Sequence, residues 1–387
     1  MSFRQLGSMA LLLVFSAPAN ADFDEVLEAF EFYGSLRGHV AGFDGETEIQ
    51  DNGSRLGLRF SRRFGGQVEL LAGAEWSLNL FDSDFTFNVD SGTDTGFAVI
   101  DRTDTGDTFA TRLGYLGVDF GSGGRLTIGK QWGAYYDLSG WTDNFDVFGG
   151  EASFTFVAGT DGGTLGTGRA EKSLLYRNDF GKLKIGAQVQ LAASDDATAV
   201  DPGQGLSLRY GVTERLSLGA AYNGAQVDSS MSGQVVGLTD DPKYLVFGVR
   251  YETERLQLAA IWAEQENGDF VDVVDPMTMA PVSIVYDASG LEVYGSFDLT
   301  ERFRLTGGLN VTDPDRIDPR VDPDFQIKYY VVGARWFFDR RTFAYFEARL
   351  DDSIDPAGQA GVDVVTLGLR FDFSLRKQSA ATDGNPD

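Results

Sequence analysis

The sequence DVVTLGLRFDF, residues 363–373, alternates between apolar and polar or small side chains from Val365 onward. The apolar set is Val365, Leu367, Leu369, Phe371 and Phe373, and the other set is Thr366, Gly368, Arg370 and Asp372. Successive side chains of a β-strand point to opposite faces, so this segment predicts a strand with one apolar and one polar face. Residues 55–60 and 183–191 repeat the pattern.

Short turns separate such strands at regular intervals. They lie at residues 63–66, 121–124, 179–182, 213–215, 253–255, 300–302 and 339–341. These seven turns join fourteen strands, and a first strand at 31–43 and the last at 363–373 make sixteen. An even number lets the first and last strands pair antiparallel, which leaves no unpaired edge in lipid.

The connections at the other ends of these strands are long and polar. They are residues 44–53, 82–107, 135–167, 192–203, 228–242, 266–288, 312–324 and 351–362. Short turns on one side and long loops on the other are typical of bacterial outer-membrane barrels, with the turns in the periplasm and the loops outside. The sequence therefore predicts an all-β fold, a sixteen-stranded antiparallel transmembrane β-barrel.

The two ends of the chain are expected to lie outside the barrel. Residues 1–21 read as a cleaved signal peptide, with Arg4, an apolar segment at 9–15 and an A-x-A site ending at Ala21. The barrel is then predicted to span 22–373, followed by a polar, disordered tail at 374–387. No other segment has the roughly 20 apolar residues that a membrane helix needs.

Composition excludes several classes of function. The net charge of −26 makes nucleic acid an unfavourable partner, because binding there depends on Lys and Arg neutralising phosphates. With no cysteine and His39 as the single histidine, a zinc site lacks ligands. No G-x-S-x-G motif accompanies that histidine. We therefore expect no catalytic site, no metal centre and no cofactor, with a structural Ca²⁺ at the acidic surface loops left open.

One long connection carries specific motifs. Residues 129–151 read GKQWGAYYDLSGWTDNFDVFGGE, with the pair Tyr135-Tyr136, Trp141-Thr142-Asp143 and Phe148-Gly149-Gly150. This segment resembles the third loop of the general bacterial outer-membrane porins. The resemblance implies that the loop folds back into the barrel and narrows the channel. It also implies a homotrimer in the Gram-negative outer membrane, in contact with lipid and lipopolysaccharide.

The resemblance further suggests which residues form the constriction. The acidic loop side would comprise Asp143, Asp146, Asp137 and Glu151, and the basic wall Arg37, Arg55, Arg112 and Arg169. The chain departs from the family pattern in two places. It has Asp146-Val147 where the family has Pro-Glu, and Ser35 where the family has Lys, for which Arg37 could substitute.

These features predict a diffusion channel for small hydrophilic solutes and ions, with a modest cation preference because fixed charges set ion preference in a narrow pore. Two alternatives stay open. One is a substrate-selective porin for sugars or carboxylates, for which Tyr136 and Trp141 could provide an aromatic path. The other is a plugged barrel with a structural or adhesive role.

Overall fold

The structure, a computed structural model, describes residues 27–81, 87–88, 109–158, 160–191, 200–227, 238, 240–315 and 318–376. The predicted signal peptide and residues 377–387 of the predicted tail lie outside this range. The strands are β1 (Phe30–Phe43), β2 (Glu46–Asp51), β3 (Arg55–Phe64), β4 (Val68–Leu78), β5 (Phe109–Asp119), β6 (Arg125–Lys130), β7 (Ser173–Phe180), β8 (Leu183–Gln190), β9 (Val200–Gly211), β10 (Leu216–Val227), β11 (Lys243–Glu252), β12 (Leu256–Val274), β13 (Pro281–Thr300), β14 (Phe303–Asp315), β15 (Ile327–Phe337), β16 (Thr342–Asp351) and β17 (Val364–Arg376). The helical segments are η2 (Gly121–Gly123) and α3 (Tyr136–Ser139).

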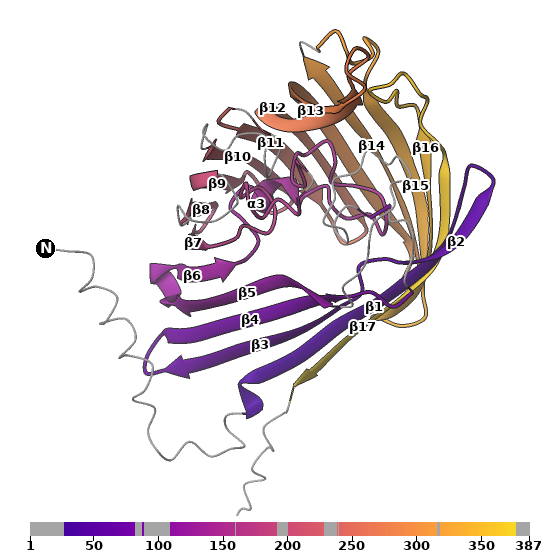
Figure 1. Cartoon of the computed structure of the whole chain (residues 1–387). Coiled ribbons are helices and arrows are strands. Elements are labelled where there is room, and N and C mark those ends of the chain that lie inside the picture. The colour runs from indigo at the N-terminus through magenta and orange to yellow at the C-terminus, as the bar shows by residue number, and fades with distance from the viewer. Residues whose placement is uncertain are drawn as a thin grey trace, which may run out of the picture.

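The strands form one closed antiparallel barrel (Figure 1). Sixteen strands make its wall, because β2 and β3 pair with successive parts of β1 and act as one interrupted strand. The barrel closes where β1 pairs with β17, from Glu31 opposite Arg376 to Phe43 opposite Val364. The predicted fold and strand number are confirmed. No helix in the described part of the chain is long and apolar enough to cross a membrane.

The structure corrects three predicted boundaries. Residues 44–53, predicted as a loop, contain β2, which pairs with β1 after a tight turn at Asp44-Gly45 where both residues have positive φ. Residues 266–288 are mostly strand, because β12 and β13 continue past the bulge after Gln265. The last strand reaches Arg376, three residues beyond the prediction, and Ser374 donates a 2.6 Å hydrogen bond to Glu31 there.

The two faces of the wall differ as the alternation predicts. Outward side chains such as Leu116, Leu367 and Leu369 are each at least 60% exposed, as expected for a surface that contacts lipid. Inward side chains such as Glu75 and Glu347 are polar and buried, and they hydrogen-bond within the lumen. The apolar packing in this barrel therefore lies in the lumen beside the inserted loop and not between two sheets.

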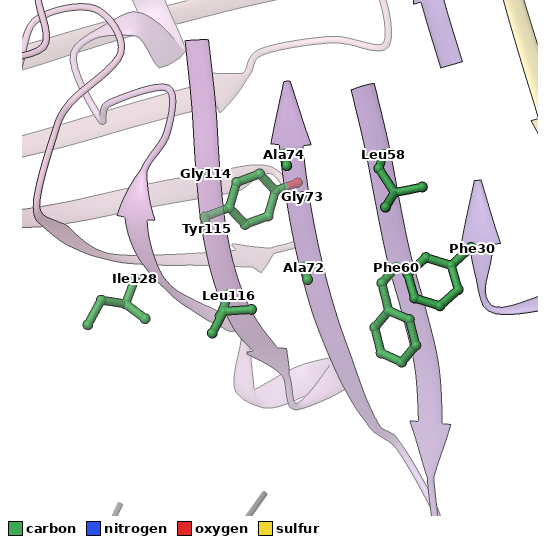
Figure 2. Close-up of a pocket in the computed structure, with 10 residues that line it drawn as sticks. All are labelled: Phe30, Leu58, Phe60, Ala72, Gly73, Ala74, Gly114, Tyr115, Leu116 and Ile128. Atoms are coloured by element: carbon green, nitrogen blue, oxygen red, sulfur yellow. The ribbon is translucent and has the colours of Figure 1, made fainter. Parts of the chain in front are cut away.

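The outer face carries a depression of about 450 Å³ over β3–β6 (Figure 2). Its floor is made of small residues, including Ala72 and Ala74 of β4 and Gly114 of β5. Its rim is made of larger apolar side chains, namely Phe30, Leu58, Phe60, Leu116 and Ile128. The wall is therefore thinner here.

Candidate functional site

The segment between β6 and β7, residues 131–172, lies inside the barrel (Figure 1). It opens with the short helix α3, which contacts β9, β10 and β11. It then continues along the inner wall to β16, where Glu347 accepts hydrogen bonds from its main chain. The prediction of a long loop folded into the lumen is confirmed.

Wall glycines make room for the loop. Leu138 of α3 packs over Gly219 of β10, and the ring of Trp141 packs over Gly248 of β11. A Cβ at position 248 would lie 3.1 Å from the Trp141 ring. Because glycine has no Cβ, the apolar side of the loop can sit directly on the wall backbone. The loop aromatics thus hold the loop against the barrel, as Tyr135 also does at 0% exposure.

Replacing Gly290 of β13 by alanine is expected to displace the loop from its seat. A Cβ at position 290 would overlap the carbonyl oxygen of Ala152, a main-chain atom that cannot rotate away. Overpacking of this kind costs about 1–3 kcal/mol. We expect a lower urea midpoint for the folded protein in detergent, followed by tryptophan fluorescence. Gly307→Ala is the control, because its nearest neighbour, the Val331 oxygen, lies 3.4 Å away. Equal midpoints would contradict this docking.

Buried wall carboxylates bind the loop through its main chain. Glu347 of β16 accepts the N–H groups of Asp146 and Val147 at 2.7 Å each, and of Phe148 at 3.2 Å. Glu292 of β13 accepts the N–H of Gly150 at 2.7 Å. Asp269 of β12 accepts that of Ala158 at 3.0 Å. Hydrogen bonds from N–H groups to carboxylates are among the stronger ones in proteins.

Two of the predicted loop carboxylates pair with arginines of the wall. Asp146 is 4% exposed, and its Oδ2 lies 2.6 Å from Nε of Arg335 on β15. Glu151 lies 3.4 Å from Arg349 on β16. Neither arginine was among the predicted wall residues. Both ion pairs fix the far end of the loop, so these carboxylates have a positioning role in addition to any effect on permeating ions.

The other two predicted carboxylates lie near the start of the loop. Asp137 accepts hydrogen bonds of 3.1 Å from Nε of Arg177 and lies 3.8 Å from Arg209. Asp143 accepts a 2.8 Å hydrogen bond from the Tyr136 hydroxyl and stays half-buried. Both side chains are therefore held by hydrogen bonds in the folded protein.

Two predicted basic residues lie together on the wall. Arg112 of β5 lies 2.9 Å and Arg55 of β3 lies 4.0 Å from the same oxygen of Glu75 on β4. The hydroxyl of Tyr33 donates to the other oxygen at 2.9 Å. The predicted arginine cluster therefore contains its own carboxylate, which partly neutralises it.

The remaining predicted basic residues differ in position. Arg37 of β1 is buried, and its Nε donates a 2.6 Å hydrogen bond to Ser35. Arg169 lies in the loop itself before β7 begins, and not on a wall strand as predicted. It pairs with Asp161 at 3.0 Å, because the returning chain packs against its own earlier part. Whether these arginines and the loop carboxylates act across one constriction stays a prediction.

His39 is a polar residue of the lumen. It is 3% exposed and lies within hydrogen-bonding distance of the Tyr345 hydroxyl and of Gln50. Among the described residues, no three acidic or histidine side chains converge in a way that could hold a metal ion.

A closed barrel with a long loop seated in its lumen is the architecture of an outer-membrane channel protein. The chain belongs to the Gram-negative porin family, whose model matches residues 8–355. It lies in the Gram-negative outer membrane as a multi-pass β-barrel, and its relatives support an outer-membrane diffusion channel.

Individual relatives agree with this assignment. Outer membrane protein S2 of Salmonella typhi is 24% identical over 94% of this chain and 97% of its own length. Outer membrane porin N of Escherichia coli K12 is 27% identical over 68% of this chain and 75% of its own. Salmonella typhi OmpF, solved as a complex with daunomycin, superimposes with a TM-score of 0.72 at 18% identity, covering 89% of this chain and 98% of that one. This structural likeness shows the fold.

Proposed function

We propose that the barrel conducts small hydrophilic solutes and ions passively and with a modest cation preference. The observation that carries this proposal is a cavity of about 700 Å³ left open in the lumen beside the loop, between β1 and β9. A plug in this half of the lumen would fill that space. The start of the loop contacts β7 and β9 at the edge of this cavity, and the loop then continues over β10 to β16.

The charges around the pore support the cation preference. Three described outer segments, residues 44–51, 266–288 and 351–363, contain thirteen acidic residues and no Lys or Arg. A fourth outer segment, residues 312–324, contains five Asp and two Arg. Glu75 also partly neutralises the wall arginines. Such fields concentrate cations at the pore mouth.

The proposal is tested by recording from the purified full-length protein in a planar bilayer. We expect stepwise openings and a reversal potential that favours K⁺ under a KCl gradient. The cation preference should be weaker in 1 M KCl than in 0.1 M KCl, because the screening length is about 3 Å at the higher concentration and about 10 Å at the lower one. Asp143→Asn should reduce it, whereas Asp339→Asn in the turn before β16 should not. Folded protein without conductance would overturn the proposal.

The aromatic residues argue against the sugar-selective alternative. Trp132 stacks on Tyr136 with ring centroids 3.8 Å apart, and Trp141 is 7% exposed. Tyr136 therefore packs a face on Trp132, and Trp141 packs on the wall. A sugar-binding path would need faces that are open to the lumen.

We further propose that three copies associate through the outer depression over β3–β6. A porin with this fold, Vibrio cholerae OmpT, has been solved in a trimer form, with a TM-score of 0.60 at 17% identity over 89% of this chain and 99% of that one. Small residues on a membrane-facing surface allow a neighbour to approach closely. The rest of the outer face would contact lipid and lipopolysaccharide, where acidic loops could share divalent cations such as Ca²⁺.

Filling the depression is expected to weaken the trimer without unfolding the barrel. Ala72→Leu/Ala74→Leu adds apolar volume where a neighbour would pack, yet stays compatible with lipid. We expect the trimer band on a semi-native gel to dissociate at a temperature lower by several degrees. Ala220→Leu, on the outer face of β10, is the matched control. A trimer equally stable in both variants would place the interface elsewhere.

A further inference from the structure

The open cavity lies at the turn end of the barrel, beneath the start of the inserted loop. It reaches the β5–β6 turn at Gly121 and Gly124 and the β7–β8 hairpin at Asp179 and Lys184. Trp132 lines it on the loop side. We call this space the inner vestibule. In an outer-membrane barrel the turn end faces the periplasm.

The lining of the inner vestibule has a small excess of basic side chains, although the chain as a whole is strongly acidic. Its lining contains five basic and three acidic side chains. The basic ones are Arg59, Arg125, Arg177, Lys184 and Arg209, and the acidic ones are Glu75, Asp119 and Asp179. The β7–β8 turn at its mouth is basic as well, since residues 181–184 contain two Lys and no acidic residue. The opposite mouth bears the acidic segments described above.

Two of these arginines keep unused hydrogen-bonding capacity. The contact of Arg209 with Asp137, at 3.8 Å, is too long for a hydrogen bond, and the side chain is 27% exposed although its Nε is buried without a partner among the described residues. Arg59 lies 3.7 Å from Glu31, stacks 3.8 Å over the Tyr33 ring and is half-exposed. By contrast, Arg177 is occupied by Asp137 and by two main-chain oxygens.

We propose that the inner vestibule binds small multivalent anions, such as di- and tricarboxylates or phosphate, that enter from the turn end. Arg209 and Arg59 would each donate N–H groups to the ligand, because a guanidinium matches carboxylate and phosphate oxygens in two-point contacts. This inference rests on the proposed channel function. The pore would then have two unlike halves, with an outer mouth that attracts cations and an inner one that retains anions.

Citrate at pH 7 is the probe, applied to one side of single channels in 0.1 M KCl. We expect a saturable decrease of the current when citrate is added at the turn end, and little effect from the other side, where the acidic mouth repels it. The variant Ser122→Cys, in the β5–β6 turn, reports the orientation of the channel in the bilayer. This cysteine would be the only one in the chain, so a membrane-impermeant thiol reagent identifies the chamber that faces the turns.

The variant Arg59→Gln/Arg209→Gln should raise the half-blocking citrate concentration by about tenfold, because it removes two charges within contact distance of the ligand. Arg62→Gln/Arg63→Gln, at the turn end of β3 and outside the cavity lining, should change it less than about twofold, as expected for exposed and screened charges. Unchanged block in the first variant, or equal block from both sides, would overturn the inference.

A second measurement keeps this inference separate from the channel function. Titration calorimetry of the folded protein in detergent reports citrate binding whether or not the barrel conducts. Binding that is lost in Arg59→Gln/Arg209→Gln supports the anion site even if the conductance proposal fails. Normal KCl conductance without citrate binding rejects the anion site and leaves the conductance proposal standing.

Discussion

Replacing Glu347 by alanine is expected to release the inserted loop and to cost about 3 kcal/mol of stability. The substitution leaves three main-chain N–H groups, at Asp146, Val147 and Phe148, without their acceptor. An orphaned buried N–H costs about 1–3 kcal/mol. Water in the lumen can reach the vacated site, so we take the lower value for each group. The far end of the loop should then move away from β16.

Two measurements check this expectation. The urea midpoint of the folded protein should fall, and single channels should show a larger and noisier open level, because the loop no longer holds one position. Glu347→Gln keeps one acceptor oxygen and should give a smaller effect of the same sign. Glu46→Ala, an exposed carboxylate on β2, is the matched control. If Glu347→Ala and Glu46→Ala have the same urea midpoint and the same open level, the hydrogen bonds from Glu347 to the main chain do not hold the loop.

The second large effect is expected from Glu75→Gln, on ion preference. Glu75 lies between Arg55 and Arg112, so removing its charge raises the local positive charge by one unit. The interaction energy of two unit charges 4 Å apart in water is about 1 kcal/mol. That corresponds to about fivefold in relative permeability. The pore should therefore shift towards Cl⁻, because glutamine keeps the polar contacts while the arginine charges are no longer balanced.

The reversal potential under a KCl gradient measures this shift directly. The amide oxygen introduced by Glu75→Gln can still accept hydrogen bonds from Tyr33 and Arg112, so we expect the barrel to fold. Glu264→Gln, an exposed carboxylate on β12, provides the control with the same loss of charge outside the lumen. A permeability ratio that is equal in the two variants would mean that permeating ions do not sense the arginine cluster.

Sequence patterns predicted the wall of this barrel well. Alternation is a local property, and it places β1 within one residue of its observed start at Phe30. The same alternation continues through β12 and β13 beyond the bulge after Gln265, as Val271 and Ile284 show by their burial. We predicted a loop there because polar residues such as Asp272 and Asp275 suggested one. A strand that continues beyond the membrane into water can carry charged side chains and still form its backbone hydrogen bonds to the neighbouring strand.

The contacts of the inserted loop could not be predicted in the same way. Period-2 alternation puts Glu347, Glu75 and Arg335 on the inner face, but it does not say which segment each side chain meets. Those partners depend on the path of a loop that spans several strands. Arg169 shows the limit most clearly, because its pairing with Asp161 follows from the loop folding back on itself.

The seat of the loop has a consequence for how this pore could diversify. Glu347, Glu292 and Asp269 hold main-chain N–H groups, and every residue except proline supplies one. These hydrogen bonds do not depend on the side chain of the loop residue, so they persist when that side chain changes, except at Asp146, which also pairs with Arg335, and at Gly150, whose φ is positive. Natural selection or protein design could therefore change the side chains that contact the solute while the attachment of the loop to the barrel stays the same.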